Sequence, residues 1–283
     1  MARPDVAVVT DSTSSLPEGL AARCGVTVVP LHVVLGGRSG LEGVEVPPVE
    51  VAAALRERRV QVSTSRPTPA QFAAAYRASH AKEIVSVHLS AALSGTCDSA
   101  RLAAQQVAAE GIEVQVVDSG SIAMGLGFAA LAAAEAAQSG GDLAAVASAA
   151  ARTGQATSTF FYVDTFEHLR RGGRMTARSA LVGTALAVKP LLVVRGGAIE
   201  LLEKVRTASR ALARLEELVV AAAGDCPVDI AVHHLESPDR AAAMGEALTA
   251  RLPHMGDCYL SEVGAVLGAH VGPGLLGVVV RPR

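Results

Sequence analysis

The chain has 283 residues, of which 25 are Lys or Arg and 27 are Asp or Glu, so its formal net charge at pH 7 is -2. This near balance gives no support for nucleic-acid binding or for stable binding to an anionic membrane surface. Half of the residues are hydrophobic but only 3% are aromatic, so Ala, Val and Leu must fill most of a core, and the length allows one large or two ordinary domains.

The cysteines and the chain start indicate the cellular compartment. The four cysteines, Cys24, Cys97, Cys226 and Cys258, form no CxxC pair, which favours free thiols in a reducing compartment over a metal cluster or a disulfide framework. The N-terminus runs directly into a predicted strand, and no uninterrupted apolar run reaches membrane-spanning length. We therefore predict a cytoplasmic protein without a bound metal.

The first half of the chain alternates strands and helices. Such alternation is typical of a mostly parallel sheet with helices on its faces. Pro30 cannot donate to a strand ladder, so we expect a sheet edge or a bend there. The predicted strands are 6–10, 26–29 followed by 30–35, 83–87 and 112–119; the predicted helices are 17 onward, 49–58, 69–79, 99 onward, a stretch ending near 137 and one ending near 153; 36–48 and 62–69 are predicted loops.

From Thr159 onward the regular alternation of strands and helices changes. Apolar stretches flank Gly196-Gly197 and predict a hairpin of strands 191–194 and 199–202. Two helices, 209–223 and 238–249, and two strands, 230–233 and 277–280, complete this half. We predict an α/β protein of two domains: residues 1–154 as a three-layer domain with a mostly parallel sheet, and 155–283 as a two-layer domain with a mixed sheet.

The segment around Ser94 is the strongest candidate for a binding site. The apolar run 83–87 predicts a buried strand, and strong helix formers follow Ser99. A chain that turns through Ser94-Gly95-Thr96 into a helix directs free backbone N–H groups and hydroxyls at one spot, which attracts anions. The simpler alternative is that Ser94 or Thr96 only caps the helix.

Three other segments are similar in kind: 10–13, 63–68 and 268–274. Ligands of parallel α/β sheets bind beyond the carboxyl ends of the strands, where both 10–13 and the Ser94 turn are expected. Together they favour a shared anion site. For His270, the residues alone favour a turn histidine ahead of Gly272-Pro273-Gly274.

Weaker signals have structural explanations. The GxGxxA pattern at 125–130 begins well beyond Ser119, which favours helix packing over dinucleotide binding. His233 and His234 are adjacent in a predicted strand, so we expect one buried and one exposed side chain and no metal site. The arginines of 170–174 indicate a solvated face, or alternatively a patch that faces phosphate or docks a kinase.

Several motifs occur in order along nearly the whole chain: Thr10-Asp11-Ser12-Thr13, Thr64-Ser65-Arg66-Pro67-Thr68, Leu93-Ser94-Gly95-Thr96, Asp164-Thr165 with Gly172-Gly173-Arg174, and His270-Val271-Gly272-Pro273-Gly274. Together they resemble the motifs of the DegV family, bacterial fatty-acid-binding proteins that act as the carrier subunit of fatty acid kinase. The resemblance implies two α/β domains, a buried acyl chain and a head group near the junction of the domains.

Carried over by position, the resemblance implies that Thr64, Ser94 with Gly95, and His270 hold the fatty-acid carboxylate. Arg206 resembles a family arginine near the pocket mouth that is linked to kinase-dependent phosphorylation. The remaining implied pocket or partner-docking residues are Arg174 and Ser12.

The family usually has leucine and tyrosine where this chain has Phe166 and His168, which weakens the case for kinase contact through that segment. The implied function is that of a non-catalytic carrier. It would bind a long-chain fatty acid, present the carboxylate to a partner kinase and hold the acyl phosphate, with no cofactor and only transient membrane contact.

The energetics of such a ligand agree with the resemblance. Hydrogen bonds to a charged group contribute about 1.5–3 kcal/mol each, which offsets the cost of burying the carboxylate. The tail adds about 0.8 kcal/mol per buried methylene, so it dominates affinity while the head group sets orientation.

Two alternatives remain open from the sequence. One is a stand-alone phosphotransferase or hydrolase with Ser94 as nucleophile and His270 as base, although no group to orient His270 is evident. The other is a sensor of small anions without an acyl pocket.

Overall fold

The computed structural model describes residues 4–57, 60–175 and 188–283. The chain divides into two compact units: the first comprises the residues up to His32 and Ser65–Ala156, and the second comprises Val33–Thr64 and Thr157–Arg283. The predicted continuous domains 1–154 and 155–283 differ from this grouping at residues 33–64, which pack with the later part of the chain.

The first unit is built on a four-stranded sheet whose pairings are all parallel, which confirms the predicted parallel sheet. β2 is an edge strand that ends directly before Pro30, as expected of a residue without an N–H. The strand order is β2 (Val26–Val29), β1 (Val6–Asp11), β6 (Glu83–His88), β7 (Glu113–Asp118).

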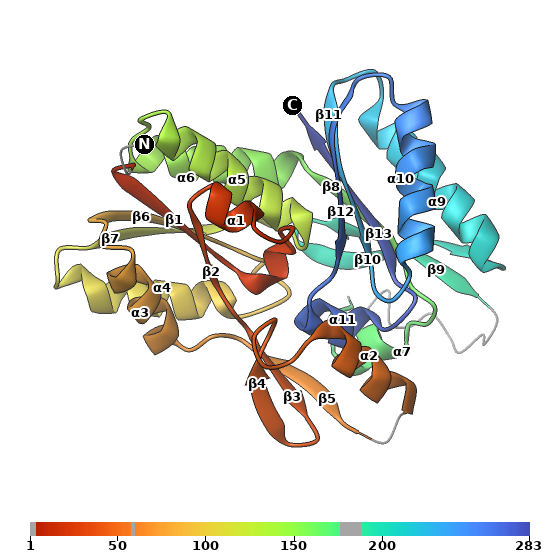
Figure 1. Cartoon of the computed structure of the whole chain (residues 1–283), viewed down its shortest axis with the longest axis horizontal. Coiled ribbons are helices and arrows are strands. Elements are labelled where there is room, and N and C mark those ends of the chain that lie inside the picture. Colours follow the sequence, from red (N-terminus) through yellow and green to blue (C-terminus); the bar gives the residue numbers. More distant parts are fainter. Residues whose placement is uncertain (1–3, 58–59, 176–187) are drawn as a thin grey trace. The chain divides into compact units, whose positions relative to one another are not determined.

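Helices cover both faces of this sheet, which makes three layers (Figure 1). One face carries α3 (Pro69–Ala78) and α4 (Thr96–Ala108), and the other carries α5 (Met124–Gln138) and α6 (Leu143–Ala156). The helix predicted from Pro17 begins only at Leu20, because Gly19 adopts a left-handed conformation with φ 73° ahead of the short α1 (Leu20–Arg23). A 3-10 turn, η1 (Ser12–Ser14), follows β1.

The GxGxxA segment lies inside α5, a helix that is buried on most of its faces. A Cβ on Gly127 would lie 2.8 Å from the carbonyl oxygen of Ser14. The glycine therefore permits close packing of α5 on η1, which confirms the helix-packing interpretation.

The second unit contains a mixed six-stranded sheet, as predicted. β11 and β12 are parallel and the other neighbours are antiparallel, including the predicted hairpin around Gly196-Gly197. α9 (Ala208–Ala223) and α10 (Pro238–Arg251) pack on this sheet through a core of aliphatic side chains. The strand order is β10 (Ala198–Val205), β9 (Lys189–Arg195), β8 (Ser158–Tyr162), β13 (Leu276–Pro282), β11 (Val228–His234), β12 (Met255–Glu262).

Residues 33–64 form most of a small separate sheet in the order β4-β3-β5. The prediction of loops at 36–48 and 62–69 was wrong in part, because each contains a strand. The bounds are β3 (His32–Leu35), β4 (Arg38–Leu41), α2 (Pro48–Glu57) and β5 (Val62–Ser65). α2 packs against α11 (Ala265–Val271), which in turn contacts α7 (Glu167–Arg171).

His233 and His234 are both buried, with 2% and 8% exposed surface, so the prediction of one exposed histidine was wrong. All seven residues of β11 are buried. Side chains alternate between the two faces of the sheet, but both faces of this central strand are covered, so neither histidine is exposed.

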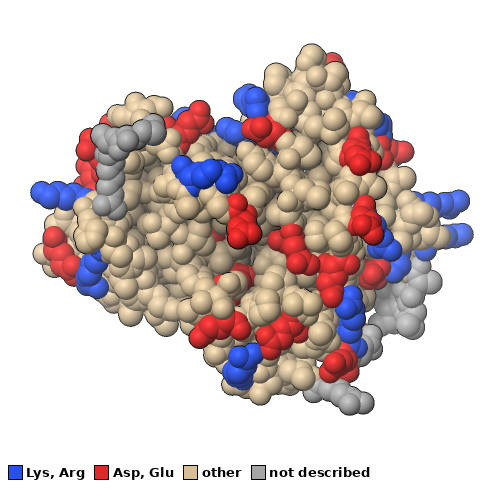
Figure 2. All heavy atoms as spheres, viewed as in Figure 1, with Lys and Arg blue, Asp and Glu red and all other residues tan. Residues whose placement is uncertain are grey.

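The distribution of surface charge and the lengths of the apolar helices agree with what the composition indicates. Figure 2 shows a face on which most surface atoms belong to uncharged residues, with basic and acidic side chains in small groups of either sign. Within 4–57, 60–175 and 188–283, no helix is long and apolar enough to cross a membrane, and no three His, Cys, Asp or Glu side chains form a group that could hold a metal ion.

Candidate functional site

The second unit brings together two residues that the resemblance assigns to the carboxylate. Thr64 lies on β5, and His270 lies near the end of α11. Thr64 Oγ1 and His270 Nε2 are hydrogen bonded at 2.9 Å although they are 206 positions apart in the chain. His270 is thus a helical residue with a tertiary partner, and the interpretation of a simple turn histidine was wrong.

Two glycines make room for the histidines of this region. A Cβ on Gly172, directly after α7, would lie 2.4 Å from His270 Nδ1. A Cβ on Gly272, directly after α11, would lie 2.3 Å from His168 Cδ2. The His270 ring is therefore held between the Thr64 hydroxyl and the backbone at Gly172, which leaves it little freedom to rotate.

Burial, together with the nearby positive charge of Arg174, lowers the pKa of His270 to about 4. The ring is neutral near pH 7, so one nitrogen carries a hydrogen and the other accepts. Nε2 can accept from Thr64 or donate to a bound oxygen, depending on the tautomer. A neutral imidazole in this position suits a hydrogen bond to an anion and does not need a counter-charge.

A cavity of about 150 Å³ opens beside this pair. Arg174 lines it and also donates from Nη1 to the carbonyl oxygen of Gly172. Two hydroxyl, two imidazole and two guanidinium side chains line this small space, which favours a small anionic group. The polar lining residues are Ser63, Thr64, His168, Arg171, Arg174 and His270, with Leu55, Val62 and Ala269 as apolar neighbours.

Glu42 ties the segment 33–64 to the helix that carries His270. The Val266 N–H, in the first turn of α11, donates to Glu42 Oε1 at 2.6 Å, and the Glu42 residue is only 5% exposed. A Cβ on Gly264 would lie 2.2 Å from the same oxygen, so glycine is needed at that point of close approach. A carboxylate at this end of a helix is electrostatically favourable.

Glu42→Gln should therefore lower the free energy of unfolding by about 1 kcal/mol, because the amide keeps an acceptor for Val266 but removes the charge. Chemical denaturation followed by circular dichroism measures this change. Glu57→Gln, at an exposed position on α2, is the matched control and should leave the stability within about 0.5 kcal/mol of wild type. Equal effects of the two substitutions would contradict the assigned role.

The Ser94 loop belongs to the first unit and is held by backbone hydrogen bonds. The first backbone amides of the loop are hydrogen bonded within the protein: Leu89 N donates to Asp11 Oδ2 at 3.1 Å, and Ser90 N donates to the carbonyl oxygen of Ser121 at 2.9 Å. The next amide, Ala91 N, donates to the Asp118 carboxylate at 3.2 Å. The loop is thus anchored on both sides, from β1 and from the segment after β7.

The start of α4 differs from a simple capped helix. Its N-cap is Gly95, with no hydrogen bond from a capping side chain, so the interpretation of Ser94 or Thr96 as a conventional cap was wrong. Instead Ser94 Oγ and Thr96 Oγ1 are hydrogen bonded to each other at 2.8 Å. One hydrogen serves this bond, so the accepting hydroxyl keeps its own hydrogen to donate elsewhere.

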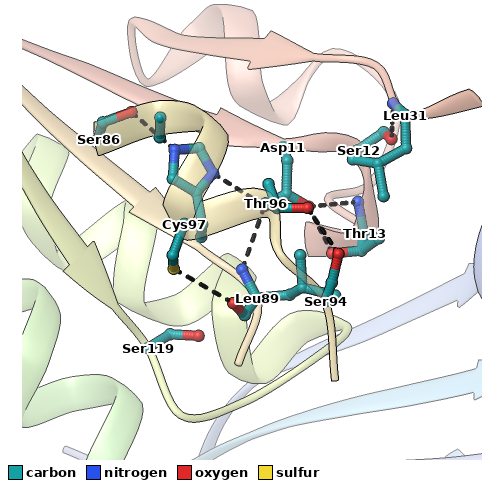
Figure 3. A network of polar contacts seen from close by, with 12 residues as sticks. Asp11, Ser12, Thr13, Leu31, Ser86, Leu89, Ser94, Thr96, Cys97 and Ser119 are labelled. Atoms are coloured by element: carbon teal, nitrogen blue, oxygen red, sulfur yellow. Dashed lines mark hydrogen bonds and ion pairs between the residues drawn. The ribbon is translucent and has the colours of Figure 1, made fainter. Parts of the chain in front are cut away.

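Asp11 is the centre of the polar network shown in Figure 3. Its Oδ1 accepts from the backbone N–H of Thr13 at 3.0 Å and from the Thr13 hydroxyl at 2.5 Å. Its Oδ2 accepts from Leu89 N and from His88 Nδ1, the latter at 2.9 Å. Asp11 and His88 have no exposed surface, so this hydrogen-bonded carboxylate positions both the η1 turn and the beginning of the Ser94 loop.

The other assigned residues lie apart from these contacts. Ser12 accepts a hydrogen bond from Leu31 N at 2.9 Å, which gives its hydroxyl a structural partner. Arg206 is exposed between β10 and α9 and does not line the cavity around Thr64. Ser12, Ser94 and Gly95 belong to the first unit, and Thr64, Arg174, Arg206 and His270 belong to the second.

The sequence interpretation missed Arg66, Glu42 and His88 as contributors to these sites. Arg66 Nη1 donates to the carbonyl oxygen of Gly95 at 3.1 Å. Arg66 lies in one of the motifs quoted for the resemblance, where its positive charge could have indicated an anion-binding residue. For Glu42 and His88 the sequence carries no such signal, because their partners are 224 and 77 positions away.

Comparison with known proteins gives a consistent result. A family model described as "Uncharacterised protein, DegV family" matches residues 5–283. A DegV domain-containing protein of Streptomyces coelicolor is 57% identical over 281 residues, covering 98% of this chain and 99% of its own length. Protein DegV of Bacillus subtilis is 33% identical over 281 residues, covering 97% of this chain and 98% of its own length.

Two solved structures are close in fold. A structure described as fatty acid binding of a DegV family protein from Thermus thermophilus has a TM-score of 0.90 and 35% identity, and the match covers 98% of this chain and 99% of that one. The structure of DegV, a fatty acid binding protein from Bacillus subtilis, has a TM-score of 0.90 and 32% identity, with 99% and 100% coverage.

Proposed function

Because the chain belongs to the DegV family, we propose that it binds a long-chain fatty acid. The observation that carries the proposal is the hydrogen-bonded pair of Thr64 and His270 beside a small cavity with two arginines. Two structures with more than 30% identity are described as fatty acid binding, which supports the same ligand for this chain.

In the proposed complex, Thr64, Ser94 and His270 bind the carboxylate near the junction of the predicted domains. Thr64 and His270 supply a hydroxyl and a neutral imidazole, and the Ser94–Thr96 pair supplies a further hydroxyl hydrogen. Only Ser65 separates Thr64 from Arg66 in the chain, and Arg66 contacts Gly95, which follows Ser94. This short covalent link supports one head group as the ligand of both sets.

Denaturing the purified protein and analysing the extract by mass spectrometry tests for the ligand directly. We expect a co-purifying fatty acid in stoichiometric amount. Absence of a fatty acid, together with no binding of added palmitate to the lipid-free protein, would overturn the proposal.

Ser94→Ala and Thr64→Val should each weaken palmitate binding by about tenfold or more, since each removes a hydrogen bond to a charged group. Calorimetric titration of the lipid-free proteins measures the change. Thr249→Val is a matched control, because that hydroxyl donates to the carbonyl oxygen of Gly245 within α10, and we expect its affinity to equal wild type. Unchanged affinity in both site variants would contradict the assignment.

We further propose that the protein presents the bound carboxylate to a separate kinase and then holds the acyl phosphate. The exposed position of Arg206 is compatible with docking of such a partner. With ATP, palmitate and the catalytic subunit of a fatty acid kinase, acyl phosphate should form only when this protein is present. Turnover by the isolated protein with ATP would favour the alternative in which Ser94 and His270 act as an enzyme.

A further inference from the structure

Arg66 occupies the space that a side chain on Gly95 would fill. A Cβ on Gly95 would lie 1.7 Å from Arg66 Nη1 and 2.9 Å from Arg66 Cζ. The guanidinium is therefore in contact with the N-cap of α4, the residue that separates Ser94 from Thr96. Gly95 has φ -76°, a conformation that any residue adopts, so the absence of a side chain here matters for the approach of Arg66 and not for backbone strain.

The charge of Arg66 is not neutralised within the part of the chain that the structure describes. Its one hydrogen bond there is to the carbonyl oxygen of Gly95, and no carboxylate pairs with it. Two other exposed arginines of the first unit differ: Arg77 pairs with Glu110 and Arg101 pairs with Asp98. A guanidinium carries five N–H donors, so most donors of Arg66 face solvent or a ligand.

The backbone next to Arg66 is rigid. Pro67 is buried, and Thr68 is the N-cap of α3 and forms a reciprocal capping box with Gln71. Gln71 also makes a 3.1 Å hydrogen bond to His32. The backbone of Arg66 and its hydrogen bond to Gly95 together keep the guanidinium beside the start of α4, which favours a role in recognition.

We infer that Arg66 binds the anionic head group of the ligand and makes affinity depend on its negative charge. The inference rests on the proposed function, because Ser94 and Arg66 both border Gly95. Hydroxyl donors bind a neutral head group as well as an anionic one, although more weakly, whereas a guanidinium adds a charge attraction that only the anionic head group receives. Arg66 is thus a specificity-determining residue for ionised fatty acids over neutral lipids of the same length.

The test compares palmitate with 1-hexadecanol, which has the same chain length and no charge, on the lipid-free full-length protein. Arg66→Gln should raise the dissociation constant for palmitate about tenfold and leave that for hexadecanol within about twofold. Gly95→Ala, whose Cβ would displace the guanidinium, should cause a loss of the same kind. Arg101→Gln, at an exposed arginine of α4, is the control and should change neither value.

Equal affinity of wild type and Arg66→Gln for palmitate would overturn the inference while leaving the proposed function intact. An equal loss for both lipids would also overturn it, because it would assign Arg66 a structural role. If wild type binds neither lipid, the proposed function fails, and the inference fails with it.

Discussion

Replacing Asp11 with asparagine should lower the free energy of unfolding by about 3 kcal/mol, because each buried donor that loses its acceptor costs about 1–3 kcal/mol. The carboxylate accepts four hydrogen bonds, two at each oxygen. The asparagine amide offers one oxygen and one NH2 group. Two of the four donors that now face the carboxylate would therefore face the NH2 group, which cannot accept from them. His88 can change its tautomer, but the backbone N–H of Leu89 or Thr13 cannot, and an unpaired buried donor is costly.

Asp118→Asn is the matched control for this experiment. Asp118 accepts from Ala91 N and from Gly120 N at 2.9 Å, but it is exposed, so water can replace a lost partner. We expect its substitution to cost at most about 1 kcal/mol. Denaturation followed by far-ultraviolet circular dichroism measures both, with separate fits if the two units unfold in separate transitions. A cost for Asp11→Asn as small as that of the control would show that the network is not required for stability.

The same network illustrates what the sequence could and could not predict. β6 and β7 were predicted because their apolar residues lie in short runs that identify strands locally. The importance of Asp11 depends on His88 and Leu89, which the fold brings to the end of β1. No local pattern encodes that proximity.

The missed strands have a common physical explanation. β5 contains Ser63 and Thr64, whose polar side chains are typical of a loop. It forms a strand because it pairs within the small sheet that also contains β3 and β4. β12 is an edge strand with five of its eight residues exposed and with Gly256 and Asp257 near its start, which weakens its apolar pattern. In both, tertiary pairing outweighs local propensity.

The candidate site was predictable only through the resemblance to a family. From the residues alone, His270 was expected in a turn, and nothing in the spacing linked it to Thr64. The family motifs named both residues, and the structure adds the contact between them. Arg66 was inside a quoted motif but received no role, because its significance depends on its contact with Gly95.

Acidification from pH 6.5 toward pH 4 should lower the stability of the lipid-free protein steeply, because His233 and His270 are kept neutral in the folded state. Burial lowers the pKa of His233 to about 4, and burial with Arg174 does the same for His270, whereas the ordinary value is 6.5. Between these values the unfolded chain binds protons that the folded chain does not. The free energy of unfolding therefore falls as the pH falls, by up to about 1.4 kcal/mol per pH unit for each histidine.

Above pH 6.5 the histidines are neutral in both states, so this contribution is fully present, and below about pH 4 the loss levels off. The measurement is the slope of the unfolding free energy between pH 5 and 6.5, above the usual range of carboxyl titration. His233→Gln should reduce that slope by up to about half, whatever its effect on absolute stability, because burial also lowers the pKa of His234 and so leaves His234 and His270 to contribute the rest. His254→Gln, at an exposed histidine, is the matched control, and its slope should exceed that of His233→Gln. A wild-type slope near zero would contradict neutral burial of His233 and His270.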